Sequence, residues 1–304
     1  MNSHSTADDS TIPAATSWLT LGVSRLEHSV AGQMQPGHLY SLVTELPSIR
    51  YPLLNNTIAE AIRAGVPCTI IEAARPEHYL EQLCTPPKFD LNDALDRRML
   101  NVYCMQSEFQ KKMFQVGVGP MLEELDRFGV EYGSLVLFDH ASSLLNLYDL
   151  NLATQQLDAI GEWGERNGLT VIMVFSQLHG SKWVTPRALM DSMSGMATLS
   201  ESSDGLAIGF PYWQFNGGVA SGVSFRIELN AEGDYEVTSW KRTPRDAEGP
   251  YPETNGMVLP ANPTIENQVV NIREFETRNS PRPSPTPGVF RNLKARRSEF
   301  DDFL

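Results

Sequence analysis

The chain has 304 residues, of which 41% are apolar and 20% are charged. This is the composition of an ordinary globular protein, so it excludes wholesale disorder and a fibrous architecture, and the length suffices to bury a hydrophobic core. The formal net charge of −13 opposes binding to nucleic-acid phosphates, and no uncharged apolar run approaches the roughly 18 residues of a membrane span.

The N-terminus and the cysteines both favour a reducing cytoplasm. The first 16 residues are polar and lack the basic and apolar regions of a signal peptide, so we expect residues 1–17 to form a flexible arm. The chain has three cysteines, Cys68, Cys84 and Cys104. Their odd number and wide spacing predict neither a disulfide framework nor a zinc site. None has an adjacent cation in the sequence, so we expect buried, inert thiols.

Residues 18–243 alternate between strand-like and helix-like patterns, which indicates one α/β domain. Short links between strand, helix and strand are typical of a parallel sheet with right-handed crossovers. In chain order, we expect a strand at 39–43, a helix at 53–64, a strand at 68–71, a helix starting at Pro76, a helical stretch at 107–128 closed near Gly129, a strand at 135–139, a helix at 153–166 and a strand at 169–175.

The pattern changes beyond Gly205. Three runs with alternating apolar residues follow at 206–210, 223–229 and 234–240, and Glu232-Gly233 supplies a turn between the last two. Alternation with tight turns predicts antiparallel strands, so we expect an antiparallel extension on the edge of the parallel sheet. The glycine-rich run 216–222 is interpreted as a long hairpin loop.

The last 61 residues, 244–304, differ in composition from the rest of the chain. Residues 244–288 form a proline-rich linker, because prolines fix φ and remove amide donors. Residues 289–304 combine basic, acidic and aromatic side chains, which suits a short docking peptide that orders on a partner. We therefore expect a disordered tail whose partner-docking residues are Phe290, Leu293, Arg296, Arg297, Phe300 and Phe303.

The order of these elements resembles a RecA-like ATPase core of the KaiC type, a P-loop NTPase-type fold. In that family, the strand at 39–43 leads into a glycine-rich phosphate loop with a Lys and a hydroxyl. Here the segment at 44–51 contains no glycine, and Pro47 removes an amide. Arg50 supplies a charge in place of the Lys, but Tyr51 is too bulky for a compact magnesium site. We expect no ATP hydrolysis, and little change of thermal stability when Arg50 is replaced.

Asp139 ends the strand at 135–139, where it resembles the magnesium-facing acid of the same family. Without a phosphate loop, the simpler interpretation is an acid that caps the next turn. Arg50 and Asp139 are therefore the two degenerate cofactor-binding positions. His140 and His179 follow neighbouring strands, but their spacing is a weak metal signal, so we expect no metal site. The chain has no G-x-S-x-G motif, and Ser142 lies in a predicted loop, so we expect no catalytic residue.

The segment from Leu21 to Pro76 is similar to the N-terminal domain of BcsE, a cytosolic accessory protein of bacterial cellulose secretion. The shared features are the Gly-Val-Ser start, the Pro-Gly turn into an apolar strand, the charged glycine-free loop, the Asn-Asn-Thr-Ile helix at 55–58 and the apolar second strand. BcsE also binds cyclic di-GMP through an Arg-x-x-Asp motif in a further module. This chain has no Arg-x-x-Asp and no length left for that module, so we do not expect cyclic di-GMP binding.

The resemblance implies a non-catalytic scaffold or regulatory subunit of a bacterial cellulose synthase secretion complex, without a cofactor. It would contact other cytosolic subunits, including a MinD-like ATPase, or pair with itself, and stay cytoplasmic at the inner membrane through the synthase. The alternative is an ATP-binding regulator of the KaiC type in which Arg50 replaces Lys and Asp139 holds metal. A third reading, a recombinase-related DNA-binding protein, is opposed by the acidic charge.

Overall fold

The computed structural model describes residues 19–24, 26, 32–44, 47–72, 76–105, 117–176, 186–203, 205–215 and 218–242. All of them belong to one compact unit, Met1–Val258. The second unit, Leu259–Leu304, lies outside the described residues, and with it the predicted docking peptide and its six named side chains. The predicted N-terminal arm, the proline-rich linker and His179 also lie outside them.

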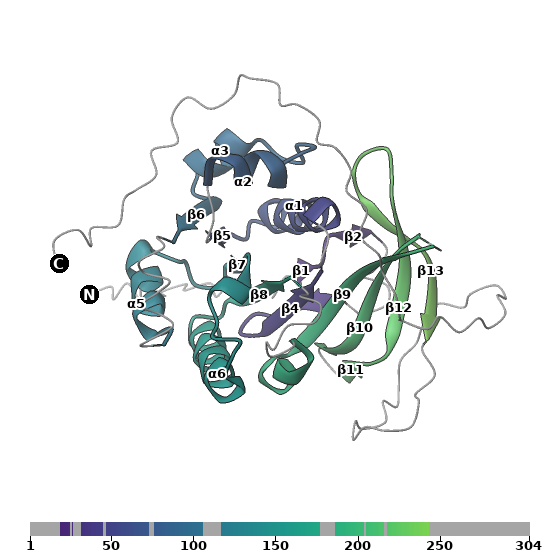
Figure 1. The fold of residues 1–304 in the computed structure, drawn as a ribbon. Coiled ribbons are helices and arrows are strands. Elements are labelled where there is room, and N and C mark those ends of the chain that lie inside the picture. Colours follow the sequence, from purple (N-terminus) through teal and green to yellow (C-terminus); the bar gives the residue numbers. More distant parts are fainter. Residues whose placement is uncertain are drawn as a thin grey trace, which may run out of the picture. The chain divides into compact units, whose positions relative to one another are not determined.

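An eleven-stranded sheet forms the centre of the described unit (Figure 1). Its strands are β2 (Val23–Ser24), β4 (Leu39–Val43), β5 (Cys68–Glu72), β6 (Leu100–Cys104), β7 (Leu135–Phe138), β8 (Thr170–Phe175), β9 (Gly195–Ser202), β10 (Gly205–Phe215), β11 (Gly218–Ala220), β12 (Val223–Leu229) and β13 (Tyr235–Arg242). A separate two-stranded sheet pairs β1 (Leu19–Thr20) with β3 (Gln33–Met34).

The strand order is β2-β13-β12-β10-β9-β4-β8-β7-β5-β6, and β11 pairs with β10. The six strands β9, β4, β8, β7, β5 and β6 are neighbours in this order and run parallel. The pairs β9–β10, β10–β12 and β12–β13 are antiparallel. The predicted parallel sheet with an antiparallel C-terminal extension is confirmed. Strands β6 and β9 were not predicted, because Asn101 interrupts the first and small residues (Gly, Ala, Ser and Thr) make up most of the second.

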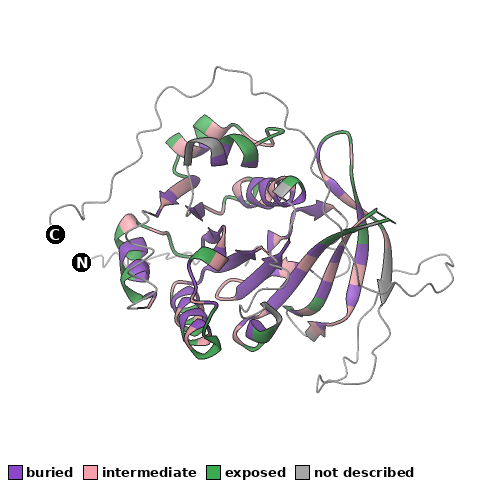
Figure 2. Cartoon of the chain, viewed as in Figure 1, coloured by how far each residue is buried: buried purple, intermediate pink, exposed green. Residues whose placement is uncertain are grey.

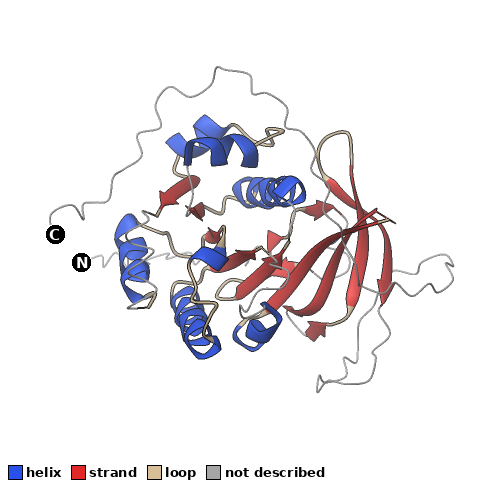
Figure 3. Cartoon of the chain, in the orientation of Figure 1, coloured by secondary structure: helices blue, strands red, loops and turns tan. Residues whose placement is uncertain are grey.

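Helices cover both faces of the parallel strands (Figure 3). One face carries α1 (Pro47–Arg63), α2 (Pro76–Leu83) and α3 (Leu91–Asp96), and the other carries α5 (Gly119–Phe128), α6 (Leu150–Arg166) and the 3-10 turns η2 (Ala141–Ser143) and η3 (Pro186–Ser192). Burial on both faces explains why the parallel strands are nearly continuous apolar runs.

Strand β8 shows how the sheet divides the core. Ile172 and Val174 pack in the cluster on the α1 side, and Met173 and Phe175 pack in the cluster on the α6 side. All six residues of β8 are buried, and buried residues dominate the central strands in Figure 2. Successive side chains of a strand point to opposite faces, so both clusters form on the same strands.

Two helices begin earlier than the apolar periodicity predicts. Helix α6 begins at Leu150 because Asp149 caps it, with Oδ1 accepting from the amide of Leu152 at 3.2 Å. Helix α1 begins at Pro47, which corrects the predicted loop at 44–51. Proline is well tolerated in the first helical turn, where its missing amide would have no intrahelical partner.

The glycine-rich run at 216–222 is not a long loop throughout. Residues 218–220 form β11, which folds back on β10 with Trp213 opposite Ala220 and Phe215 opposite Gly218. The run contains too few side chains for an alternating strand pattern, which is why the sequence did not predict it. The turn predicted at Glu232-Gly233 is confirmed, since Gly233 has a φ of 79° between β12 and β13.

None of the helices in the described part of the chain has the length and apolar character that a membrane span needs.

Candidate functional site

Three neighbouring segments bring charged side chains together at the carboxyl ends of the parallel strands. Glu72 is the last residue of β5, Asp139 and His140 directly follow β7, and Arg50 lies in the first turn of α1, which follows β4. Open α/β sheets bind ligands at this edge. We call Arg50, Glu72, Asp139 and His140 the ion cluster.

Arg50 is the centre of the ion cluster. Its Nη2 lies 3.6 Å from Oδ2 of Asp139 and 3.3 Å from Nε2 of His140. The same nitrogen donates a hydrogen bond of 2.9 Å to the Tyr51 hydroxyl, and the guanidinium carbon lies 4.7 Å from the centre of the Tyr51 ring. Arg50 is 2% exposed and Asp139 is 0% exposed. The charge pair is therefore closed to solvent.

The neighbours of His140 set its protonation state. A guanidinium can only donate, so Nε2 of His140 accepts from Arg50 and the remaining proton lies on Nδ1. Burial lowers the pKa of His140 below 6.5; the charge of Asp139 opposes this shift and that of Arg50 adds to it. His140 has a left-handed φ of 56°, and its amide donates to Oδ1 of Asp139 at 3.0 Å. His140 is thus a neutral acceptor in this cluster.

Glu72 and Tyr79 complete the surroundings of the ion cluster. One ligand atom from each of Glu72, Asp139 and His140 lies within 4.8 Å of the other two. Burial raises the pKa of the Tyr79 hydroxyl well above 10, and the charges of Asp139 and Glu72 raise it further. Burial also raises the pKa of Tyr51, although the Arg50 charge partly offsets the rise. Both phenols are therefore neutral at physiological pH.

The structure brings together the two residues that the sequence singled out, Arg50 and Asp139, but as partners of each other. The predicted capping of the next turn by Asp139 is wrong: the 3-10 turn η2 has His140 at its N-cap and no side-chain cap. Asp139 accepts from the adjacent amide of His140 and pairs with the Arg50 charge. The expectation that replacing Arg50 would scarcely change stability conflicts with this burial. Sequence reasoning missed Glu72, although an acid ends the apolar run at 68–72 as Asp139 ends the run at 135–139.

The predicted phosphate loop is also shorter than the sequence indicated. Only residues 44–46 lie between the end of β4 and the start of α1, whereas a phosphate-binding loop spans about eight residues from its first glycine to its hydroxyl. The amide of Thr44 donates to the carbonyl of Phe175 at 3.0 Å, so it is already used within the sheet. Residues 44–51 also contain no glycine, the residue that lets a phosphate loop bring its backbone close to a phosphate.

Residues 15–235 match the family model of the cellulose biosynthesis protein BcsE, N-terminal domain. The chain belongs to this family. The match covers well over half of the chain and confirms the resemblance that the sequence showed, and it links this BcsE-family chain to cellulose biosynthesis. No curated protein matches the chain.

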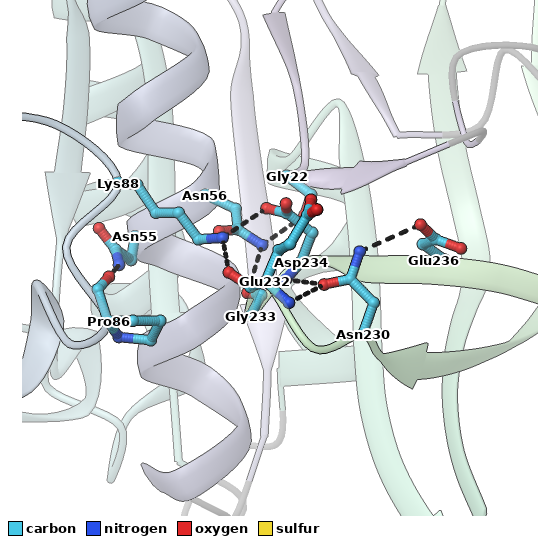
Figure 4. Close-up of polar contacts among 10 residues, drawn as sticks. All are labelled: Gly22, Asn55, Asn56, Pro86, Lys88, Asn230, Glu232, Gly233, Asp234 and Glu236. Carbon is cyan, nitrogen blue, oxygen red and sulfur yellow. Dashed lines mark hydrogen bonds and ion pairs between the residues drawn. The ribbon is translucent and has the colours of Figure 1, made fainter.

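The Asn-Asn-Thr-Ile segment of the BcsE-family chain lies in a second polar cluster (Figure 4). Asn56 of α1 donates to the carbonyls of Gly22 at 3.3 Å and Gly233 at 3.4 Å, and Asn55 donates to the carbonyl of Pro86 at 2.7 Å. Buried amides that bind the carbonyls of loops far apart in the sequence fix those loops on the helix. The two asparagines therefore have a structural role.

Lys88 extends this second cluster to the β12–β13 hairpin. Its Nζ lies 3.0 Å from Oδ1 of Asp234 and also donates to the carbonyl of Glu232. Within the hairpin, the Asn230 side chain accepts from the amides of Glu232 and Asp234 at 2.9 Å each. The contacts in Figure 4 thus join α1, the segment before α3 and the hairpin of the antiparallel extension.

The cysteines of the BcsE-family chain are free, as predicted from their spacing. Cys68 is buried, and Cys84 and Cys104 are partly buried. Burial raises the pKa of Cys84 to about 12 and that of Cys104 to about 11, and raises the pKa of Cys68 further. A thiol at physiological pH is a poor nucleophile, so these values agree with inert cysteines.

Proposed function

We propose that this chain is a non-catalytic scaffold subunit of a bacterial cellulose synthase secretion complex. Its body is a RecA-like pseudo-ATPase that acts through protein contacts, and residues 289–304 on the proline-rich linker recruit a further subunit. The observation that carries the proposal is the buried Arg50–Asp139 pair, in which the charge available for phosphate and the acid available for magnesium neutralise each other.

The RecA-like part of the proposal rests on the arrangement around β4. A helix follows this first core strand, the sheet is parallel and covered on both faces, and an acid follows β7 at the same edge. These features suit a body derived from a nucleotide-binding fold. Function is decided by the site and not by the fold, and here the sequence of residues 44–51 has no glycine with which to surround a phosphate.

The pseudo-ATPase part rests on the cost of opening the ion cluster. For ATP and magnesium to bind in the usual way, Arg50 would have to leave Asp139 and both side chains would need access to solvent. Arg50 is 2% exposed, and separating a buried pair leaves an uncompensated charge, at a cost of about 3–5 kcal/mol. Phosphoryl transfer depends on positioned metal and phosphate contacts, so such a site does not support it.

A nucleotide titration tests this part of the proposal. We expect the full chain to show no shift in melting temperature with ATP, with or without magnesium, because a ligand that does not bind cannot stabilise the native state. The Asp139→Ala variant serves as the comparison. The alternative, an ATP-binding regulator, requires submicromolar, magnesium-dependent ATP binding that Asp139→Ala abolishes. That result would replace the scaffold proposal with the regulator.

The proposed recruitment role rests on the linker as well as on the family. A docking peptide on a flexible tether raises the effective concentration of the second binding site once the body is bound. The proposed partners are other cytosolic subunits of the synthase complex, including a MinD-like ATPase, and the membrane-bound synthase itself. Cyclic di-GMP is not a proposed ligand, because the sequence contains no Arg-x-x-Asp.

A further inference from the structure

The charges of the ion cluster form an environment suited to a bound cation. Glu72 and Asp139 are both 0% exposed, and His140 directs the lone pair of Nε2 at Arg50. One ligand atom from each of these three residues lies within 4.8 Å of the other two. Two carboxylate oxygens and one imidazole nitrogen at this spacing are a donor set for Mn²⁺ or Zn²⁺.

Two buried oxygens beside Arg50 also indicate a cation. Oδ2 of Asp139 lies 3.6 Å from the guanidinium, beyond hydrogen-bonding distance, and among the described residues nothing donates a hydrogen bond to it. The Tyr79 hydroxyl lies beside the Asp139 carboxylate, which raises the pKa of the phenol through its charge and a hydrogen bond, but the contact falls short of good hydrogen-bond geometry although Tyr79 is only 4% exposed. Buried oxygens in this condition are costly, and a cation among them lowers that cost.

We propose that the Arg50 guanidinium is the resident cation of a three-ligand metal site formed by Glu72, Asp139 and His140, and that a divalent metal ion takes its place when Arg50 is removed. The guanidinium stays charged at every accessible pH and is tethered to α1, so the native cluster keeps its cation at any metal concentration. The inference rests on the proposed function, since the same ion pair closes the site to nucleotide.

The experiment is a Mn²⁺ titration of the full chain, followed by electron paramagnetic resonance of the free ion. We expect no stoichiometric binding to the wild type and one Mn²⁺ per chain in Arg50→Ala. Because the guanidinium and the metal compete for one position, the linkage between them predicts a rise in affinity on the order of 10- to 100-fold. In Arg50→Ala, added guanidinium ion at non-denaturing concentration should displace the metal.

Second substitutions identify the ligands. Arg50→Ala with Asp139→Asn should return Mn²⁺ binding to the wild-type level, because the substitution removes a charged ligand. Arg50→Ala with His140→Gln should weaken Zn²⁺ more than Mn²⁺, because zinc favours imidazole nitrogen. Arg50→Ala with Arg97→Ala is the matched control; Arg97 forms an exposed ion pair with Asp93, and its loss should leave metal binding unchanged.

Arg50→Met retains the apolar stem of the side chain and provides a second variant if Arg50→Ala does not fold. Recovery of either variant by Mn²⁺ during refolding supports the inference, whereas failure of both to bind or be recovered by Mn²⁺ overturns it. Stoichiometric Mn²⁺ binding to the wild type, as tight as to the variants, also overturns it. These outcomes are separate from the nucleotide titration: a wild type that binds no ATP keeps the proposed function even if the metal inference fails.

Discussion

Arg50 decides the chemistry of the candidate site because its charge lies where water cannot reach it. The guanidinium contacts Tyr51 of α1 and Asp139 and His140 in the link after β7. At the surface, an ion pair of this length would contribute little to stability. In the interior, each charge depends on the other, so the loss of one partner matters far more than the strength of their contact.

Replacement of Arg50 by Ala is predicted to destabilise the fold strongly. It leaves Asp139 charged, buried and unpaired, so we expect a loss of about 3–5 kcal/mol in the free energy of unfolding, measured by urea denaturation. The control is Arg97→Ala, which breaks a pair with Asp93 between side chains that are 67% and 57% exposed. That change should cost roughly 0–1 kcal/mol. Equal effects at the two positions would contradict the assignment of Arg50 to the core.

Stability is predicted to fall as the pH decreases below 6.5. Burial lowers the pKa of both His38 and His140, so near pH 6 the unfolded chain binds protons that the folded chain does not. Stability then rises with pH across that window and is lost as the pH falls through it. Glu165 opposes the shift at His38; at His140, Asp139 opposes it and Arg50 adds to it.

The His140→Gln variant isolates the contribution of one histidine. Glutamine retains an oxygen that can accept from Arg50 but does not titrate, so the decline in the urea midpoint between about pH 8 and pH 5 should be shallower than in the wild type. The companion variant is His38→Gln. His38 lies outside the ion cluster, and its Nδ1 is 2.8 Å from Oγ of Ser194. A slope unchanged in both variants would assign the pH dependence to carboxylates alone.

At the scale of elements, helix α1 connects the two halves of the sheet. Its first turn provides Arg50 to the parallel strands, and its middle provides Asn56 to Gly22 and to Gly233 of the β12–β13 hairpin. The hairpin turn approaches the segment before α3 so closely that a Cβ built on Gly233 would lie 2.6 Å from Cγ of Pro86. Position 233 therefore requires glycine for two reasons: a side chain would collide with Pro86, and the backbone has a positive φ.

The pair Gly233→Ala and Gly65→Ala separates these two requirements. Both glycines have a positive φ, 79° and 74°, so each alanine should incur a similar backbone cost of about 1–2 kcal/mol. A Cβ on Gly65 meets nothing within 4 Å, whereas one on Gly233 collides with Pro86. We expect a lower melting temperature for Gly233→Ala than for Gly65→Ala. Equal melting temperatures would mean that the hairpin moves away without cost.

At the scale of the whole molecule, the BcsE-family match and the described fold cover the same part of the chain. The match spans residues 15–235, and the described strands and helices run from Leu19 to Arg242. The buried core of both faces is built from residues in this range. The folded body therefore accounts for the family membership, and the last 61 residues, 244–304, are assigned a role only by the proposal.

Truncation before Pro281 is predicted to leave the body folded and to remove partner recruitment. Since the described core lies before residue 243, the melting temperature should change little, while copurification with the synthase complex from native membranes should fall sharply. Mass spectrometry of the copurified proteins gives the readout. The matched variant, Phe290→Ala with Leu293→Ala in the full chain, should reproduce the loss. Full copurification of the truncated chain would remove the docking peptide from the proposal.

The sequence by itself determined the α/β class, the parallel strands, the antiparallel extension and the family, because continuous apolar runs, alternation and turn residues are local signals. It also identified Arg50 and Asp139 as the residues to examine. Only the tertiary structure placed the Arg50 guanidinium beside Asp139 and added Glu72, His140 and Tyr79 to the same cluster. Strand order and helix start determine which ends meet, and contacts between residues about 90 positions apart leave no local pattern in the sequence.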